Sequence, residues 1–103
     1  MSSLGKFMKQ AQRMQQDMQR VQAELAARSV EATSGGGAVK AIAKCDGTLV
    51  SLKIDPAAVN PADVAMLEDL VVSAVNQVLG QAKDVSAQEM GKVSQGMNIP
   101  GLM

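Results

Sequence analysis

The sequence contains no histidine, tryptophan or tyrosine, and only one phenylalanine and one cysteine. Without histidine, and with no carboxylate pair in an evident pocket, few side chains are suited to acid–base catalysis. One cysteine cannot form a disulfide within the chain, and no metal-ligand spacing occurs. We therefore expect a binding protein rather than an enzyme, with no metal, no cofactor and no small-molecule substrate.

Long apolar runs are also missing. No stretch approaches the roughly 20 apolar residues that span a membrane, and the first residues lack the apolar segment of a signal peptide. We therefore expect a cytoplasmic protein that has no membrane partner. The lone Cys45 falls on the apolar side of a predicted strand, which favours a buried structural thiol over a nucleophile.

The chain has no net charge, because ten Lys and Arg residues balance ten Asp and Glu residues. Their distribution is uneven: residues 1–28 hold five basic and two acidic side chains, and residues 61–103 hold two basic and five acidic ones. The overall balance gives no support to a polyanionic partner, whereas the asymmetry points weakly to a binding surface. A length of 103 residues predicts one domain over 1–103 rather than two.

A heptad pattern is the first strong signal that the sequence does contain. Through "KFMKQAQRMQQDMQRVQAEL", apolar residues recur in steps of three and four, which predicts an amphipathic helix over about 3–27. These apolar positions are Leu4, Phe7, Ala11, Met14, Met18, Val21 and Leu25.

The period changes in residues 28–55, which predict a three-stranded antiparallel sheet. Turn signals at Gly35–Gly37 and Asp46–Gly47 separate strands expected at about 28–33, 38–45 and 48–54. Apolar and polar positions alternate along the last two strands, so one face should be buried and the other wet. The apolar set is Val39, Ala41, Ala43 and Cys45, followed by Val50, Leu52 and Ile54.

A second helix is predicted over about 61–90. Asn60 supplies its N-cap, Pro61 its first residue and Asp63 an acid in its first turn. Gly91 is expected to fray the helix, and residues 94–103 are expected to form a flexible tail.

Both helices are long for a domain of this size. At about 36 Å and about 45 Å they exceed the ~33 Å diameter of a compact 100-residue domain. Either they project from the sheet and bury their apolar stripes against a second subunit, or they pack side by side as one long helical hairpin. A symmetric homodimer would cover the stripes and the sheet edges together.

The polar face of the first helix carries a line of cations. Lys6, Lys9, Arg13 and Arg20 fall within an arc of roughly 60° over about 20 Å, with Gln16 beside them. Asp17 and Glu24 flank this line without splitting it. Such a line can meet several phosphates of a duplex, although an ordinary solvated helix face has a similar composition. Single-stranded nucleic acid is disfavoured, because its binding usually needs aromatic stacking.

Four segments in order resemble the YbaB/EbfC family of small bacterial nucleoid-associated proteins. They are "MKQAQRMQQDMQRVQAEL", "GGGAVKAIAKCDGTLVSLKIDP", "MLEDLVVSAVNQV" and "MGKVSQGMNIPGLM". The resemblance implies an α+β fold, an α–β–β–β–α protomer with a three-stranded antiparallel sheet and two long helices that form a tweezer-like homodimer. It also implies binding of double-stranded DNA with little or modest sequence preference, a place in the nucleoid, and roles in nucleoid organisation and gene regulation.

The resemblance places DNA contacts on the two projecting helices. Carried onto this sequence, these contacts are Lys6, Lys9, Arg13, Gln16 and Arg20, and then Asn76, Gln77 and Lys83. The stretch "GQAKDVSAQEM" contains few basic residues, so the first helix should contribute most of the affinity. An alternative is a protein-interaction adaptor that uses Met-rich helices and an apolar tail without binding DNA directly.

Overall fold

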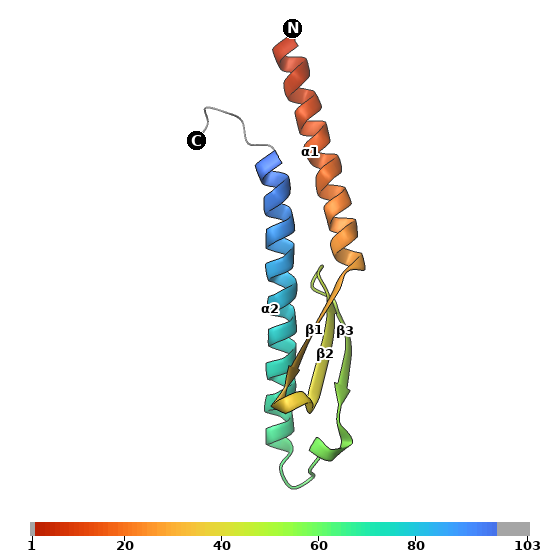
Figure 1. The fold of residues 1–103 in the computed structure, drawn as a ribbon, viewed down its shortest axis with the longest axis vertical. Coiled ribbons are helices and arrows are strands. Elements are labelled where there is room, and N and C mark those ends of the chain that lie inside the picture. Colours follow the sequence, from red (N-terminus) through yellow and green to blue (C-terminus); the bar gives the residue numbers. More distant parts are fainter. Residues whose placement is uncertain (1, 97–103) are drawn as a thin grey trace.

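The computed structural model describes residues 2–96, which form two long helices and a three-stranded sheet (Figure 1). Helix, three strands and helix follow one another, so the predicted α+β fold is confirmed. The molecule is elongated, with principal extents of 74 × 25 × 16 Å. The elements are α1 (Ser2–Ala27), β1 (Ser29–Ser34), the short 3-10 turn η1 (Gly35–Gly37), β2 (Val39–Lys44), β3 (Leu49–Ile54), a second 3-10 turn η2 (Pro56–Ala58) and α2 (Val64–Gly96).

The sheet is antiparallel, with β2 between β1 and β3. Ala41 lies opposite Ala32 on one side and Leu52 on the other, so these three side chains share a face. Between β2 and β3, Gly47 has a φ of 95°, which favours glycine. Asp46 accepts a hydrogen bond from the Thr48 amide at 2.9 Å, and hydrogen bonding to Thr48 lowers the pKa of Asp46.

Small side chains let α2 lie close against β1 and β2. Ala41 and Ala43 of β2 and Ala74 of α2 are fully buried, together with Val39 and Val78. Because alanines occupy these central positions, the helix and the strands pack closely there. A polar contact adds to this packing, because the Ser34 hydroxyl donates to the Leu70 carbonyl oxygen at 2.6 Å. The sheet is therefore fastened to the first half of α2.

The second half of α2 packs against the end of α1, and the two helices run antiparallel (Figure 1). Val21 and Leu25 of α1 form a buried cluster with Val93 of α2 and Cys45. Cys45 is only 2% exposed, in agreement with the predicted structural thiol. Because Cys45 follows β2, this cluster joins the helical pair to the sheet.

The first half of α1 has no such cover among the described residues. Leu4 and Phe7 are each 62% exposed, although the heptad pattern places them with buried Val21 and Leu25. Phe7 belongs to the apolar heptad stripe that the sequence predicts, but packing within one chain does not bury it. The buried contact between the two helices is formed by Val21 and Leu25 with Val93, and Phe7 lies about four helical turns of α1 away from it.

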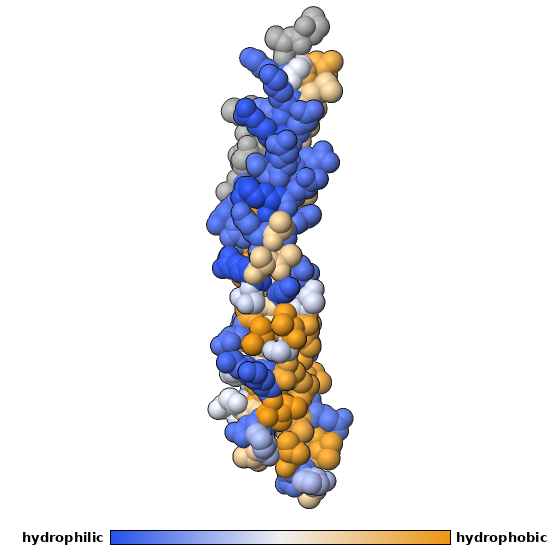
Figure 2. Space-filling view, turned by 90° about the vertical axis from the view of Figure 1, so that its right-hand side faces the viewer, coloured by the Kyte–Doolittle hydropathy of each residue, from blue (hydrophilic) through white to orange (hydrophobic). Residues whose placement is uncertain are grey.

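The outer strand β3 is less buried than its alternating pattern predicts. Its apolar side chains are all exposed, which corrects the expectation of one fully buried face. We call this group the β3 patch; it consists of Leu49, Val50, Leu52 and Ile54. The reason is that α2 packs on β1 and β2. Viewed from the β3 side, the lower half of the molecule shows a broad hydrophobic surface below a polar α1 (Figure 2).

The start of α2 also differs from the prediction. The helix begins at Val64, and Asp63 caps it by accepting a hydrogen bond from the Met66 amide at 3.2 Å. Asn60, the expected cap, instead accepts from the Ala62 amide at 3.0 Å in the preceding turn. At the other end, α2 continues past Gly91 to Gly96. The rest of the expected tail, residues 97–103, lies outside the described residues.

The glycine turn between β1 and β2 yields a graded stability test. Gly35 has a φ of 60°, and a Cβ there would lie 3.0 Å from a Leu70 methyl carbon, so Gly35→Ala should destabilise the protein by about 1–3 kcal/mol. Gly36 has a φ of 69° but open space, so Gly36→Ala should cost about 1 kcal/mol. Urea unfolding followed by circular dichroism measures both.

The matched control is Gly5→Ala. Gly5 lies inside α1, and a Cβ there meets nothing within 4 Å, so alanine should stabilise by about 0.5–1 kcal/mol. Equal effects at the three glycines would contradict the left-handed turn.

Candidate nucleic-acid interface

Three cations stand together near the start of α1. Lys6, Lys9 and Arg13 are exposed and, with Gln10, line an open depression of about 230 Å³. Within residues 2–96, no ion pair involves any of the three. We call Lys6, Lys9 and Arg13 the cationic cluster.

The spacing of the cationic cluster follows from the helix. Side chains three and four positions apart are neighbours on one face, so Lys9 lies next to both Lys6 and Arg13. Like charges at this spacing cost a few tenths of a kcal/mol in an isolated helix. An anion placed over the cluster would offset that repulsion and gain from all three charges. The arrangement is thus suited to a chain of phosphates.

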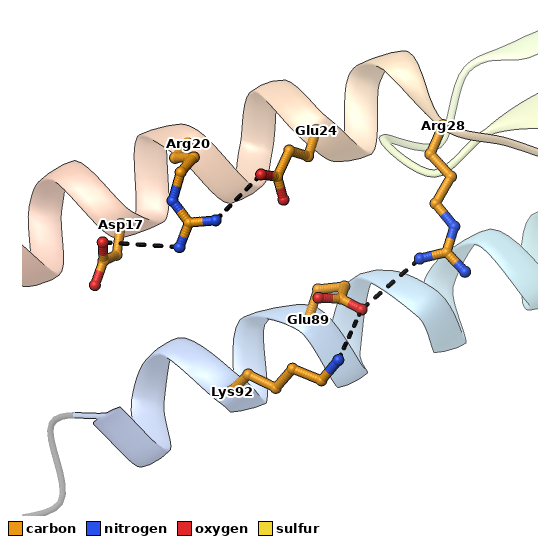
Figure 3. Close-up of polar contacts among 6 residues, drawn as sticks. All are labelled: Asp17, Arg20, Glu24, Arg28, Glu89 and Lys92. Atoms are coloured by element: carbon orange, nitrogen blue, oxygen red, sulfur yellow. Dashed lines mark hydrogen bonds and ion pairs between the residues drawn. The ribbon is translucent and has the colours of Figure 1, made fainter.

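Arg20, the fourth predicted cation, is in a different environment (Figure 3). Its guanidinium lies 3.1 Å from Glu24 Oε1 and 3.7 Å from Asp17 Oδ1. The expectation that these two acids merely flank the cationic line therefore needs correction, because they engage Arg20 from both sides. The uncompensated part of the line shortens to Lys6–Arg13, about 10 Å along the helix.

A second charge network lies between the helices, near Arg20. Glu89 of α2 accepts a hydrogen bond from Lys92 Nζ at 3.2 Å, and its Oε1 lies 3.7 Å from Arg28 Nη1 (Figure 3). Arg28 directly follows the last residue of α1, so this ion pair links the end of α1 to the second half of α2. Asp17, Arg20, Glu89 and Lys92 all border one depression of about 200 Å³. Acids and bases there compensate one another, unlike in the cationic cluster.

The predicted contacts on α2 lie away from the cationic cluster. Asn76 and Gln77 are exposed in the half of α2 that covers the sheet, and Gln77 donates a hydrogen bond to Ser73 at 3.1 Å. Lys83 borders a depression next to the β2–β3 turn. From the Val21–Val93 contact, Lys83 lies about 27 Å below Arg13 along the helix axis. One chain therefore does not bring the two predicted sets together.

Two features of this surface were missed by reasoning from the sequence. Gln10 borders the depression between the cations, although only Gln16 was predicted to accompany them. Gln16 is exposed on the same helix. The pairing of Arg20 could have been found, because Asp17 and Glu24 stand three and four positions from it.

Neither a metal cluster nor a membrane-spanning helix is found among residues 2–96. Among residues 2–96, no three His, Cys, Asp or Glu side chains lie together as metal ligands would. No helix within the same range combines the length and apolarity needed to cross a membrane.

Comparisons with known proteins match one family model and several relatives. A model described as the YbaB/EbfC DNA-binding family matches residues 1–97. A nucleoid-associated protein of Pelotomaculum thermopropionicum is 50% identical over 100 residues, covering 97% of this chain and 95% of that protein. A nucleoid-associated protein of Desulforamulus reducens is 51% identical with the same coverage.

One solved structure shares the fold. The crystal structure of an uncharacterized protein from Helicobacter pylori superposes with a TM-score of 0.65, covering 76% of this chain and 90% of that one. Its sequence identity is 20%, so this similarity concerns the fold alone.

Proposed function

Because this chain belongs to the YbaB/EbfC DNA-binding family, as its motifs predicted, we propose that it binds double-stranded DNA as a homodimer through the cationic cluster of α1. In this proposal it is a nucleoid protein with little or modest sequence preference, contributes to nucleoid organisation and gene regulation, and has no enzymatic activity. The observation that carries the proposal is the exposed, uncompensated set of Lys6, Lys9 and Arg13.

Electrostatics supports phosphate contact at this position. A cation that already forms an ion pair must give up its carboxylate partner when it binds a phosphate, so its net gain is small. The side chains of the cationic cluster have no such partner among the described residues, so they lose none on binding DNA. The cluster contacts the backbone of a duplex, and backbone contacts position a protein without reading sequence. This agrees with a low sequence preference. Gln10 and Gln16 are within reach of the same surface and can hydrogen-bond phosphates or base edges.

The placement of the only aromatic side chain favours duplex over single-stranded DNA. Binding of single strands usually combines cations with aromatic side chains on which bases stack. Phe7 is exposed, but it lies about 130° around the helix from the centre of the cationic cluster. A strand bound to the cations would therefore not stack on Phe7.

A homodimer is supported by the β3 patch. An unpaired outer strand with exposed apolar side chains is an unusual surface for a stable monomer. A second copy that buried this patch would leave both α1 helices projecting from a common body. Two cationic clusters on one particle would then present six cations to DNA, which a net charge of zero conceals.

The cationic cluster is tested by Lys9→Glu combined with Arg13→Glu. We expect the wild-type dimer to shift a generic duplex at ~50 mM salt, with a log–log salt slope near −5 for about six phosphate contacts. The double variant should lose the shift, because it reverses most of the charge of the cationic cluster. Its circular dichroism spectrum should match that of the wild type, because both changed side chains are exposed.

A matched control is Lys44→Glu with Lys53→Glu, which makes the same charge change on the exposed sheet. It should retain most of the binding. Equal losses in the two variants would reject the cluster as the contact surface. Absence of any wild-type shift, with protein partners retained from nuclease-treated lysate, would instead favour the adaptor.

The pairing of Arg20 leads to a prediction in the opposite direction. Asp17→Asn with Glu24→Gln releases Arg20, so DNA affinity should rise severalfold and the salt slope should steepen by up to about 2 per dimer. Fluorescence anisotropy over a salt series measures both quantities.

The control for this prediction is Glu68→Gln with Asp69→Asn on α2, which removes the same charge at a distance. An equal gain in DNA affinity in the Glu68→Gln/Asp69→Asn variant would show that only the net charge of the protein matters, and would contradict the release of Arg20. Adding Arg20→Gln to the first variant should remove most of the gain.

The dimer is tested by Leu52→Asp, which places a carboxylate in the β3 patch. Light scattering should show a monomer, because burying an unpaired charge costs several kcal/mol. Lys53→Asp, on the same strand and facing the other side, should remain dimeric. A dimer that persists in Leu52→Asp would move the interface elsewhere.

A further inference from the structure

The exposed apolar side of α1 is the feature that the DNA proposal does not use. Leu4 and Phe7 are each 62% exposed, and Ala11, on the same side of the helix, is also exposed. We call Leu4, Phe7 and Ala11 the N-terminal stripe. It lies where α1 extends beyond the last described turn of α2 (Figure 1). Exposed apolar side chains that gather in this way are typical of an interaction surface.

The N-terminal stripe continues an interface that exists within the chain. Val21 and Leu25 occupy equivalent heptad positions further along α1, and they are buried where α2 packs. The side of α1 that accepts a helix near the sheet is therefore the side that is exposed at the tip. Side chains at heptad spacing fit between those of a facing helix. The stripe is thus shaped for another helix.

The charges near the tip identify which helix fits. In a helical pair, the positions that flank the heptad stripe face the partner, and between residues 4 and 15 these are Met8, Gln10 and Gln15. None of the three is charged, so a partner with charged flanks gains nothing there. The cationic cluster lies about 160° around the helix from the centre of the stripe. Two copies of α1 can therefore meet without bringing like charges together.

We propose that the N-terminal stripe binds the N-terminal stripe of a second molecule, with the two α1 helices antiparallel. Phe7 of each helix then lies opposite Ala11 of the other, and Leu4 lies opposite the half-buried Met14. A large side chain facing a small one in successive layers keeps the helices evenly spaced. A parallel pair would place Phe7 against Phe7 and Ala11 against Ala11, which gives uneven layers.

The contact is short, because residues 4–14 span only about 15 Å of helix. A small interface of this kind gives a weak association that grows with protein concentration. It leaves both cationic clusters facing outward, and it places the two sheets at opposite ends of the helical pair. Because it concerns α1 alone, this inference rests neither on DNA binding nor on the β3 patch.

The first test is disulfide trapping between chains, with Cys45→Ala as background and no DNA present. A chain with Phe7→Cys and a chain with Ala11→Cys, mixed under mild oxidation, should link at least tenfold faster than Gly5→Cys mixed with Gln12→Cys. Gly5 and Gln12 are the matched control pair, because they lie at nearly the same levels but more than about 100° around the helix from the stripe. A Cβ at Gly5 meets nothing within 4 Å.

Equal rates for the two pairs would overturn the proposal. So would faster linking of Phe7→Cys to itself than to Ala11→Cys, because that result indicates parallel helices. Mass spectrometry of the linked peptides identifies which cysteines have joined.

The second test measures assembly without any cysteine. Sedimentation velocity of the wild type should show a rise in mean mass as the protein concentration is raised, and Phe7→Asp should remove most of that rise. Gln12→Asp makes the same charge change on an exposed position outside the stripe, so it should behave like the wild type. A wild-type mass that does not rise, or equal losses in the two variants, would contradict pairing through the stripe.

Discussion

The mismatch in length between the helices and the sheet determines the architecture of this protein. Strands of six residues extend about 20 Å, whereas α1 and α2, with 26 and 33 residues, extend about 39 Å and 50 Å. The first half of α2 covers the sheet, and its second half can cover only the end of α1. The beginning of α1 lies beyond both, and its side chains are exposed among residues 3–13.

Charge compensation divides α1 along its length. Near the sheet, Arg20 and Arg28 are engaged by acids of their own chain, whereas Lys6, Lys9 and Arg13 are not engaged by any described residue. Exposed ion pairs add little to stability, about 0–1 kcal/mol each. Their larger effect is on the distribution of positive charge. Because they compensate Arg20 and Arg28, the uncompensated positive charge of α1 is confined to its projecting part.

Periodicity and turn chemistry were enough to predict the order of elements. The heptad steps, the triple glycine and the Asp46–Gly47 pair each depend on local geometry, which a sequence displays directly. Burial could not be predicted in the same way. The positions of Phe7 and Leu52 fit an apolar pattern, but their exposure depends on how far α2 extends and which strands it covers. The cations of α1 were found from helical spacing, whereas the separation of Lys83 from them depends on helix pairing. The role of these side chains in DNA binding stays a prediction.

The most direct measurement is the change in backbone amide NMR shifts along the chain as a generic DNA duplex is added. The account predicts that the largest shift changes fall on residues 6–13 of α1. The changes should become small beyond Asp17, because Arg20 forms ion pairs with Asp17 and Glu24 of its own chain. Changes centred on residues 76–83 of α2, with residues 6–13 unaffected, would contradict it.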